Sequence, residues 1–204
     1  MRSTFILYIL VLASFVSLKA QSYEHSYDHH DISIAYGAFI PDQFRTVEST
    51  MLDDLFPDKR YVRDRYASMG VLLINYRHML RNEFVFLGVS AAYSSSSSEI
   101  YNVGQFEGDL DRQFITAAIE AEFRWVNLNM LQVYSGVALG YTYATESLTP
   151  PAESGAPDES GNISTVAYQL NGAGIRIGRK FAGFIEFGYG FKGIVNVGFS
   201  AQFF

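Results

Sequence analysis

Apolar and polar side chains alternate with a period of two along several segments of the chain. In residues 114–125, FITAAIEAEFRW, one face carries Ile, Ala, Phe and Trp, and the other carries Phe, Thr, Ala, two Glu and Arg. Residues 131–146 and 181–192 repeat the pattern, and the apolar face of 181–192 runs from Phe181 to Phe191. A period of two is typical of a β-strand whose faces meet different environments. These segments therefore predict strands.

Further segments bring the predicted strands to eight. The weaker segments are 31–40, 66–78, 84–94, 163–177 and 194–204. The facing of 66–78 stays open because VLLI is apolar on both faces. In 163–177 we expect a bulge near Gly172, since without one Gln169 and Arg176 would point to opposite faces.

The connections between these strands alternate in length. The long ones are 41–65, 95–111 and 147–162, and the short ones are 79–83, 126–130 and 178–180, with a tight turn at Lys192-Gly193. SSSSS and PPAESGAPDESGN have loop compositions, and TVESTMLDDLF in the first long connection is compatible with a short helix. Long connections at one end and short turns at the other are typical of bacterial outer-membrane barrels.

The less apolar strand faces distinguish a membrane barrel from a soluble, lipocalin-like one. They carry mainly small residues, whereas a water-facing surface would carry far more Lys, Glu and Asp. Charged residues make up 18% of the chain and aromatic residues 16%. Trp125, Tyr36, Tyr93 and Tyr143 lie near strand ends, where aromatic girdles form. We predict an all-β, eight-stranded antiparallel up-and-down transmembrane β-barrel with short periplasmic turns and long extracellular loops.

The N-terminal region predicts export. Residues 1–20 combine Arg2, an apolar stretch and a small residue at Ala20, as in a cleaved signal peptide; an uncleaved anchor is the alternative. Residues 21–30 would then be a periplasmic tail and 31–204 the barrel. Without cysteine, the chain has no disulfide, thiolate metal site or lipid-carrying cysteine. We therefore expect the bacterial outer membrane as its location.

Charge argues against a nucleic-acid partner. Cleavage after Ala20 would remove two of the 15 basic residues and none of the 21 acidic ones, which leaves a net charge of −8. Nucleic-acid binding requires a basic face.

The segments GFIEFGYGFKGIVNVGFSAQF and DISIAYGAFIP resemble the closing hairpin and first strand of small, porin-like outer-membrane β-barrels of the PorT/OmpA-like type from Gram-negative bacteria. The resemblance implies that the barrel-assembly machinery reads the C-terminal aromatic residue and the alternate positions before it. Phe204 follows as an extra residue on the other face, so either of the last two residues is the anchor. The implied signal comprises Val195, Val197, Phe199, Ala201, Phe203 and Phe204.

Charged residues on the small-residue faces predict a lumenal network. An unpaired buried charge is costly, and on the lipid face a charge would cost about 2–4 kcal/mol. Eight strands also leave room only for side chains, so we expect ion pairs rather than a proton path, ion path or open pore. The predicted network comprises Arg77, Glu120, Glu122, Arg124, Arg176 and Glu186.

The glycines of GYGFKG match the G-x-G-x-x-G pattern of dinucleotide sites. Such a site needs a helix after the glycines, but the eleven residues after Gly193 alternate as a strand. We therefore predict no cofactor. Gly188 and Gly190 would instead make room in the lumen, and Gly193 would permit the closing turn.

The positions of the four histidines give little support for a catalytic or metal-binding site. His25, His29, His30 and His78 all map to the periplasmic side, away from the outer leaflet where lipid enzymes place a Ser–His pair. We predict no enzyme and no metal site. The tail YEHSYDHHD could bind zinc, although a solvated linker is the simpler interpretation.

The expected role is structural or in surface interaction through the extracellular loops. The alternative is a lipid- or small-ligand-handling barrel, either an outer-membrane lipid enzyme or a soluble binder. Expected partners are outer-membrane lipids, lipopolysaccharide, the barrel-assembly machinery and an unidentified protein. Acidic residues could bridge divalent cations to lipopolysaccharide, or simply be solvated: Glu99, Glu107, Asp109, Asp111, Glu153, Asp158 and Glu159.

Overall fold

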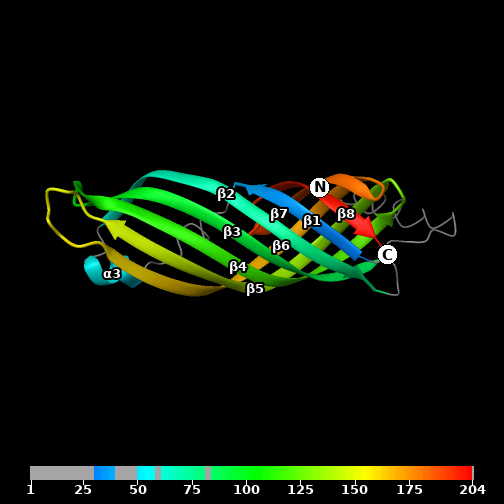
Figure 1. Ribbon diagram of the computed structural model, residues 1–204, viewed down its shortest axis with the longest axis horizontal. Coiled ribbons are helices and arrows are strands. Elements are labelled where there is room, and N and C mark those ends of the chain that lie inside the picture. The colour runs from blue at the N-terminus through cyan, green and yellow to red at the C-terminus, as the bar shows by residue number, and fades with distance from the viewer. Residues whose placement is uncertain (1–29, 40–49, 58–60, 81–83, 204) are drawn as a thin grey trace, which may run out of the picture.

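The computed structural model describes residues 30–39, 50–57, 61–80 and 84–203. Within them, eight antiparallel strands close into a barrel in which each strand pairs with its sequence neighbours and β1 pairs with β8 (Figure 1). The strands are β1 (His30–Ala38), β2 (Tyr61–Met79), β3 (Val85–Asn102), β4 (Gln105–Asn127), β5 (Leu131–Thr149), β6 (Glu159–Gly178), β7 (Phe181–Gly190) and β8 (Val195–Phe203). The predicted fold is confirmed. The proposed signal peptide, and the tail except His30, lie outside the described residues.

The strands are unequal in length. β1 pairs with β2 only from Val71 to His78, and β7 pairs with β6 only from Gln169 to Gly178. The remainder of β2 to β6 continues beyond the short strands as a curved five-stranded sheet (Figure 1). We call this part the extension, and it comprises residues 61–70, 94–113, 144–149 and 159–168.

The extension corrects the expected loop boundaries. Residues 95–102 and 105–111, which composition assigned to a loop, pair with each other as strands. Only Val103 (φ 50°) and Gly104 (φ 81°) connect them, as in a two-residue hairpin turn. The serine run continues the strand alternation, with Ser94, Ser96 and Ser98 buried inside. The prediction of a loop from the serine-rich composition was therefore wrong, because pairing with β4 holds the serines in the sheet.

The register of the strands shows which side chains of β6 and β2 point into the barrel, a question that the sequence left open. Gly136 pairs with Asn171 but Tyr134 pairs with Gly174, so the bulge expected near Gly172 is confirmed. It allows Gln169 and Arg176 both to point inward, where both are buried. In β2, Val71, Leu73, Asn75 and Arg77 point inward, whereas Leu72, Ile74 and Tyr76 are exposed on the outer surface.

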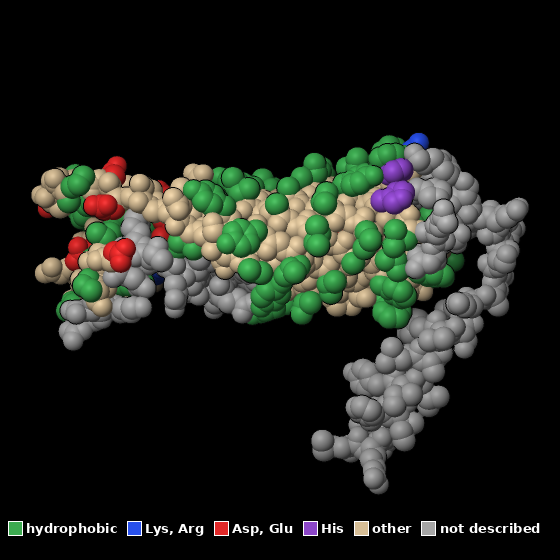
Figure 2. Space-filling model, turned by 90° about the horizontal axis from the view of Figure 1, so that it is seen from below, with side chains coloured by type: hydrophobic (Ala, Val, Ile, Leu, Met, Phe, Trp, Pro, Cys, Tyr) green, Lys and Arg blue, Asp and Glu red, His purple; other side chains and the backbone are tan. Residues whose placement is uncertain are grey.

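Between the extension and the short-turn end, the outer surface of the barrel is a belt of large apolar side chains (Figure 2). Every strand contributes at least one, including Ile34, Ile74, Val89, Ile119, Leu139, Leu170, Phe187 and Phe199. Trp125, Tyr36, Tyr93 and Tyr143 are exposed with them. The inward positions carry mainly small and polar side chains, which is the reverse of a water-soluble barrel and matches a transmembrane one. Among the described residues, no helix is long and apolar enough to cross a membrane.

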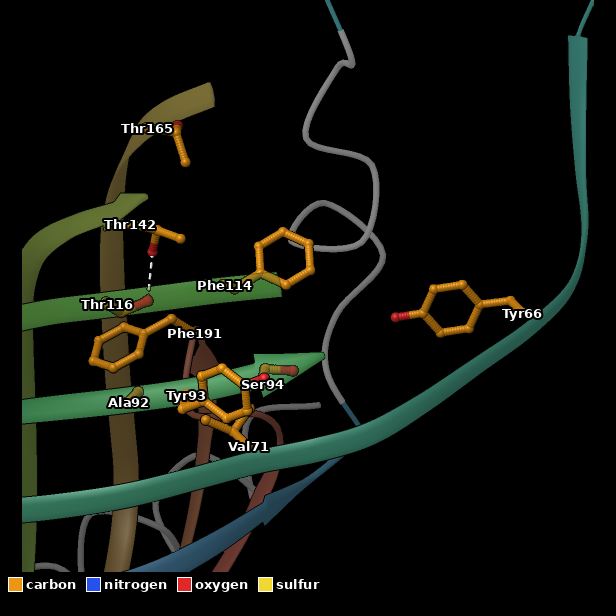
Figure 3. Close-up of a pocket in the computed structure, with 10 residues that line it drawn as sticks. All are labelled: Tyr66, Val71, Ala92, Tyr93, Ser94, Phe114, Thr116, Thr142, Thr165 and Phe191. Carbon is orange, nitrogen blue, oxygen red and sulfur yellow. Dashed lines mark hydrogen bonds between the residues drawn. The ribbon is translucent and has the colours of Figure 1, made fainter. Parts of the chain in front are cut away.

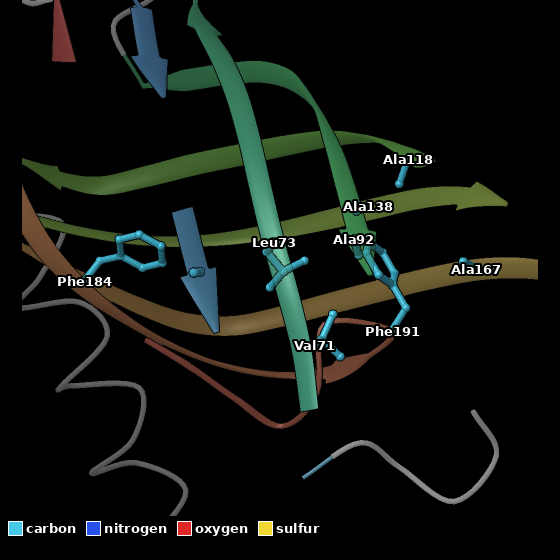
Figure 4. Packing of buried hydrophobic residues seen from close by; sticks show 9 residues of the cluster. Val71, Leu73, Ala92, Ala118, Ala138, Ala167, Phe184 and Phe191 are labelled. Carbon is cyan, nitrogen blue, oxygen red and sulfur yellow. The ribbon is translucent and has the colours of Figure 1, made fainter. Parts of the chain in front are cut away.

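Phe191 departs from the predicted facing. It was expected to continue the outer apolar face of β7, but it is buried inside the barrel. The strand ends at Gly190, and the chain then turns inward, with the Phe191 backbone N–H donating to the Tyr168 carbonyl at 3.1 Å. Phe191 thereby joins a buried apolar layer across the interior with Val71, Leu73 and alanines of β3 to β6 (Figure 4).

The far end of the extension has an apolar core of its own. The helix α3 (Thr50–Leu55) lies there (Figure 1), and Leu52 is fully buried. Leu52 packs against Ile100, Leu110 and Leu148 on the inner face of the extension. The short helix expected in TVESTMLDDLF is therefore present, and it fills the end of the extension.

Candidate functional site

The densest charge in the described structure lies inside the barrel, within the height of the apolar belt. Four acidic and four basic side chains point inward there, and all are buried. We call them the lumenal charge cluster: Asp31, Arg77, Glu120, Glu122, Arg124, Arg176, Glu186 and Lys192. The six residues named from the sequence lie in it, together with two that were missed. Because the opposite charges are equal in number, the cluster is formally neutral.

Arg77 of β2 is the centre of the cluster. Its Nε lies 2.7 Å from Glu120 Oε1, and its Nη1 lies 3.1 Å from Glu122 Oε2. Its Nη2 is 3.5 Å from Glu186 Oε1, and Nη1 is 3.8 Å from Asp31 Oδ1. Alternation along β4 places both glutamates on the inner face, two residues apart. Four carboxylates around one guanidinium provide the pairing that a buried charge requires.

Asp31 joins the other two arginines to the cluster. Arg124 Nε lies 2.7 Å from Glu122 Oε1, and Arg124 Nη2 lies 3.5 Å from Asp31 Oδ2. Arg176 Nε is 3.9 Å from the same oxygen, and Gln202 Nε2 donates to it at 2.7 Å. Asp31 was missed because it follows the acidic, histidine-rich tail. Its inward parity on the first strand was the available signal.

Lys192 was also missed, because it was assigned only to the closing turn. Its Nζ lies 2.5 Å from Glu120 Oε2 and 3.3 Å from Asn75 Oδ1. Its backbone N–H donates to Gln169 Oε1 at 2.9 Å. These contacts hold the turn between β7 and β8 inside the barrel. The parity that Lys192 shares with Glu186 in 181–192 was the available signal.

Tyr134 and Asn171 complete the polar environment of Glu186. The Tyr134 hydroxyl donates to Glu186 Oε1 at 2.9 Å, and Asn171 Nδ2 donates to Oε2 at 3.1 Å. The bulge in β6 brings Asn171 into this position. Both carboxylate oxygens of Glu186 are therefore bonded.

The interior leaves little free space. A cavity of about 40 Å³ lies on the extension side of the cluster, lined among others by Tyr66, Phe114 and Phe191, with Thr116 and Thr142 hydrogen-bonded at 2.6 Å (Figure 3). A second cavity beside Arg77 measures about 10 Å³. Sites for small-molecule ligands usually measure about 300–1,000 Å³, whereas a water needs about 10–15 Å³. These cavities can hold only waters.

The inner face of the extension carries a second buried ion pair, between Arg112 and Glu146. Burial lowers the pKa of Arg112, and the nearby positive charge of Arg63 lowers it further, while Glu146 opposes both effects. The pair lies between the apolar core around Leu52 and the small cavity. The ion pair and the apolar core around Leu52 thus both lie on the inner face of the extension.

The outer face of the extension is acidic (Figure 2). Asp64, Glu99 and Asp109 occupy adjacent positions on β2, β3 and β4. Arg65 Nη1 donates to Glu99 Oε1 at 2.8 Å, and the Tyr101 hydroxyl donates to Glu99 Oε2 at 2.8 Å. The hydrogen bond to Glu99 raises the pKa of Tyr101. Glu153, Asp158 and Glu159 continue the acidic surface at the tip of the extension.

The GYGFKG glycines do not form a nucleotide site, because β8 rather than a helix follows them. Gly188 lies against the Gln169 and Asn171 side chains, and Gly190 lies against Gln169. Gly193 has a φ of 89° in the turn between β7 and β8.

The C-terminal positions alternate outward on β8, where Val197 and Phe199 are exposed and Val195, Ala201 and Phe203 are partly exposed. Phe203 pairs with His30 at the junction of the last and first strands. Phe204 lies outside the described residues.

His30 and His78 face each other on β1 and β2 at the short-turn end of the barrel. His25 and His29 lie outside the described residues. No group of three or more His, Cys, Asp or Glu suited to a metal ion occurs in the described part of the chain.

No protein-family model and no curated sequence matches the chain. Two crystal structures of Ail, the attachment invasion locus protein of Yersinia pestis, are similar to it. The first, in complex with the heparin analogue sucrose octasulfate, has 17% identity and a TM-score of 0.45, covering 85% of this chain and 98% of Ail. The second has 16% identity and a TM-score of 0.40, covering 86% and 98%.

Proposed function

We propose that the chain is an integral outer-membrane barrel that conducts no ions and uses the acidic extension for interactions at the cell surface. The observation that carries this proposal is the lumenal charge cluster, which fills the interior while the apolar belt surrounds it. A filled barrel cannot act as a channel, so the parts outside the belt remain for function. Short turns lie on the periplasmic side in outer-membrane barrels, which would place the extension outside the cell.

The extension has the properties of a binding surface. Its strands and apolar core make it a fixed shape rather than a set of loops. Residues 61–70 of β2 and 159–168 of β6 lie at its two sides, beyond the pairing with β1 and β7. The candidate partners are an unidentified protein and lipopolysaccharide, the latter through divalent cations held by the acidic face.

The apolar belt and β8 suggest two further partners. The belt would contact outer-membrane lipids, and the outward alternation of β8 would serve as the signal for the barrel-assembly machinery. The closing hairpin supports a relationship to the PorT/OmpA-like type. Export would follow from residues 1–20 as a cleaved signal peptide.

The decisive experiment combines location, topology and conductance. An epitope inserted after Gly155, an exposed turn with open space around it, should react with antibody on intact cells. The protein should fractionate with the outer membrane and migrate differently on SDS gels before and after boiling. Reconstituted in planar bilayers, it should give no conductance steps. A soluble, heat-insensitive protein, an epitope reached only after permeabilisation, or regular conductance steps would each contradict the proposal.

The lipid- or ligand-handling alternative gains no specific support. The cavities are too small for a ligand, and both described histidines lie at the end of the barrel opposite to the extension.

A further inference from the structure

Two histidines meet on the outer surface at the short-turn end of the barrel (Figure 2). His30 opens β1, and His78 is its direct partner on β2. Their ring centroids are 4.8 Å apart, with the ring planes at 43°. Both side chains are accessible from outside. The pair belongs neither to the lumenal charge cluster nor to the extension.

The ring separation fits a shared metal ion. Zn²⁺ binds imidazole nitrogen at about 2.0–2.1 Å with tetrahedral angles, which places the centroids of two liganding rings about 5 Å apart. The observed centroid separation of 4.8 Å is close to this value. Because the histidines are direct partners on paired strands, the backbone already holds them together. A metal ion would therefore meet two imidazole rings that the strands already hold side by side, and water would complete its coordination.

Tyr76 orients one of these ligands. Its hydroxyl lies 2.8 Å from His30 Nδ1. In the tautomer with hydrogen on Nδ1, this nitrogen donates to the tyrosine oxygen, and Nε2 keeps its lone pair for a metal. Such an outer partner fixes the tautomer and ring orientation of metal-bound histidines. Phe203 stacks on His30 from the other side, with ring centroids 5.5 Å apart, and limits its rotation further.

We propose that His30 and His78 form a two-histidine site for a divalent transition-metal ion, with Zn²⁺ as the reference ligand. A bound ion would join β1 to β2 next to the junction where β1 pairs with β8 and the barrel closes. The site would thus link metal availability to the stability of the closed barrel. This proposal does not depend on the function of the extension.

The test titrates the full mature chain, purified in detergent and stripped with EDTA, with ZnCl₂ alone by calorimetry. The parent protein should bind one equivalent, and His78→Gln and His30→Gln should each weaken affinity at least tenfold. Tyr76→Phe should weaken it by about tenfold, as expected for loss of an orienting partner. The matched control, His25→Gln with His29→Gln, removes two other imidazoles and should change affinity less than threefold.

A second measurement identifies the ligands. Electron paramagnetic resonance of Cu²⁺ bound at one equivalent should show two nitrogen ligands in the parent protein and one in His78→Gln. All variants should keep the heat-dependent gel shift in EDTA, so that lost binding is not lost folding. Equal Zn²⁺ affinity in the parent protein and His78→Gln, or binding abolished by the His25/His29 control alone, would overturn the proposal.

Discussion

Lys192 Nζ lies 2.5 Å from Glu120 Oε2, although Lys192 belongs to the turn after β7 and Glu120 lies within β4. The contact spans the interior, and it exists because the turn folds into the lumen instead of extending outward. Glu120 also pairs with Arg77, so the closing turn is tied to the centre of the lumenal charge cluster. The last hairpin of the chain and the charge network are therefore one structural unit.

Lys192→Met should destabilise the barrel. The substitution keeps an unbranched side chain that is one atom shorter, but it leaves the buried cluster with one excess negative charge. Breaking a buried ion pair costs about 3–5 kcal/mol, and the value should lie near the lower end because Glu120 keeps Arg77. Urea unfolding in lipid vesicles measures the loss. Lys180→Met, at an exposed lysine, is the control, and equal effects of the two variants would show that the buried pair is not responsible.

Glu186→Ala should lower the unfolding temperature in detergent without changing localisation. Arg77, Tyr134 and Asn171 would each lose a hydrogen-bond acceptor. Unsatisfied buried groups cost about 1–3 kcal/mol each. Glu186→Gln should cost less, because the amide oxygen still accepts from Tyr134. An unchanged melting curve, or equal losses for Ala and Gln, would contradict this account. Glu153→Ala, at an exposed position, provides the baseline.

Gly193→Ala should destabilise the closing turn more than Gly155→Ala destabilises the extension. Both glycines have positive φ, so both substitutions carry backbone strain of about 1–2 kcal/mol. A Cβ at Gly193 would also lie 2.5 Å from the Ala38 carbonyl oxygen, whereas one at Gly155 would meet open space. The difference between the losses in unfolding free energy caused by Gly193→Ala and Gly155→Ala measures the cost of this contact with Ala38. A difference of zero would mean that the turn can move away from Ala38.

Tyr101 should ionise at higher pH than free tyrosine. Its pKa in the folded protein is raised above the ordinary 10.0, mainly by donation to Glu99. The folded state therefore holds this proton more tightly, and the resulting stability is present below pH 10 and disappears as the pH rises through the folded pKa. NMR titration with selective ¹³C labelling of tyrosine would measure the pKa of Tyr101. Glu99→Gln should move the value back toward 10.0, and an unmoved value would contradict the role of Glu99.

Strand number, facing and the core of the charge cluster were predictable because alternation with a period of two is a direct consequence of strand geometry. It placed Glu120, Glu122 and Glu186 inside the barrel without any knowledge of their partners, whereas the facing of 66–78, which carries Arg77, was decided only by the register of β1 on β2. The position of the bulge also followed from parity alone, since Gln169 and Arg176 could not otherwise share a face.

The extent of the strands was not predictable from composition. Serine favours loops on average, but pairing with β4 keeps Ser96 and Ser98 in β3. The inward course of Phe191 and Lys192 depends on contacts with Tyr168 and Gln169, which are remote in sequence. The histidine pair was likewise invisible, because only the register of β1 on β2 brings His30 to His78.

The hairpin of β3 and β4 ends in a two-residue turn, and its strands pair up to that turn. Such a hairpin keeps the inner and outer faces of its existing positions when both strands lengthen together by two residues at a time. Each such step adds about 7 Å along the strand. The distance that this surface reaches can therefore be lengthened in steps by paired dipeptide insertions, while a single inserted residue would either form a bulge, as already occurs near Ile100, or reverse the facing of the positions beyond it.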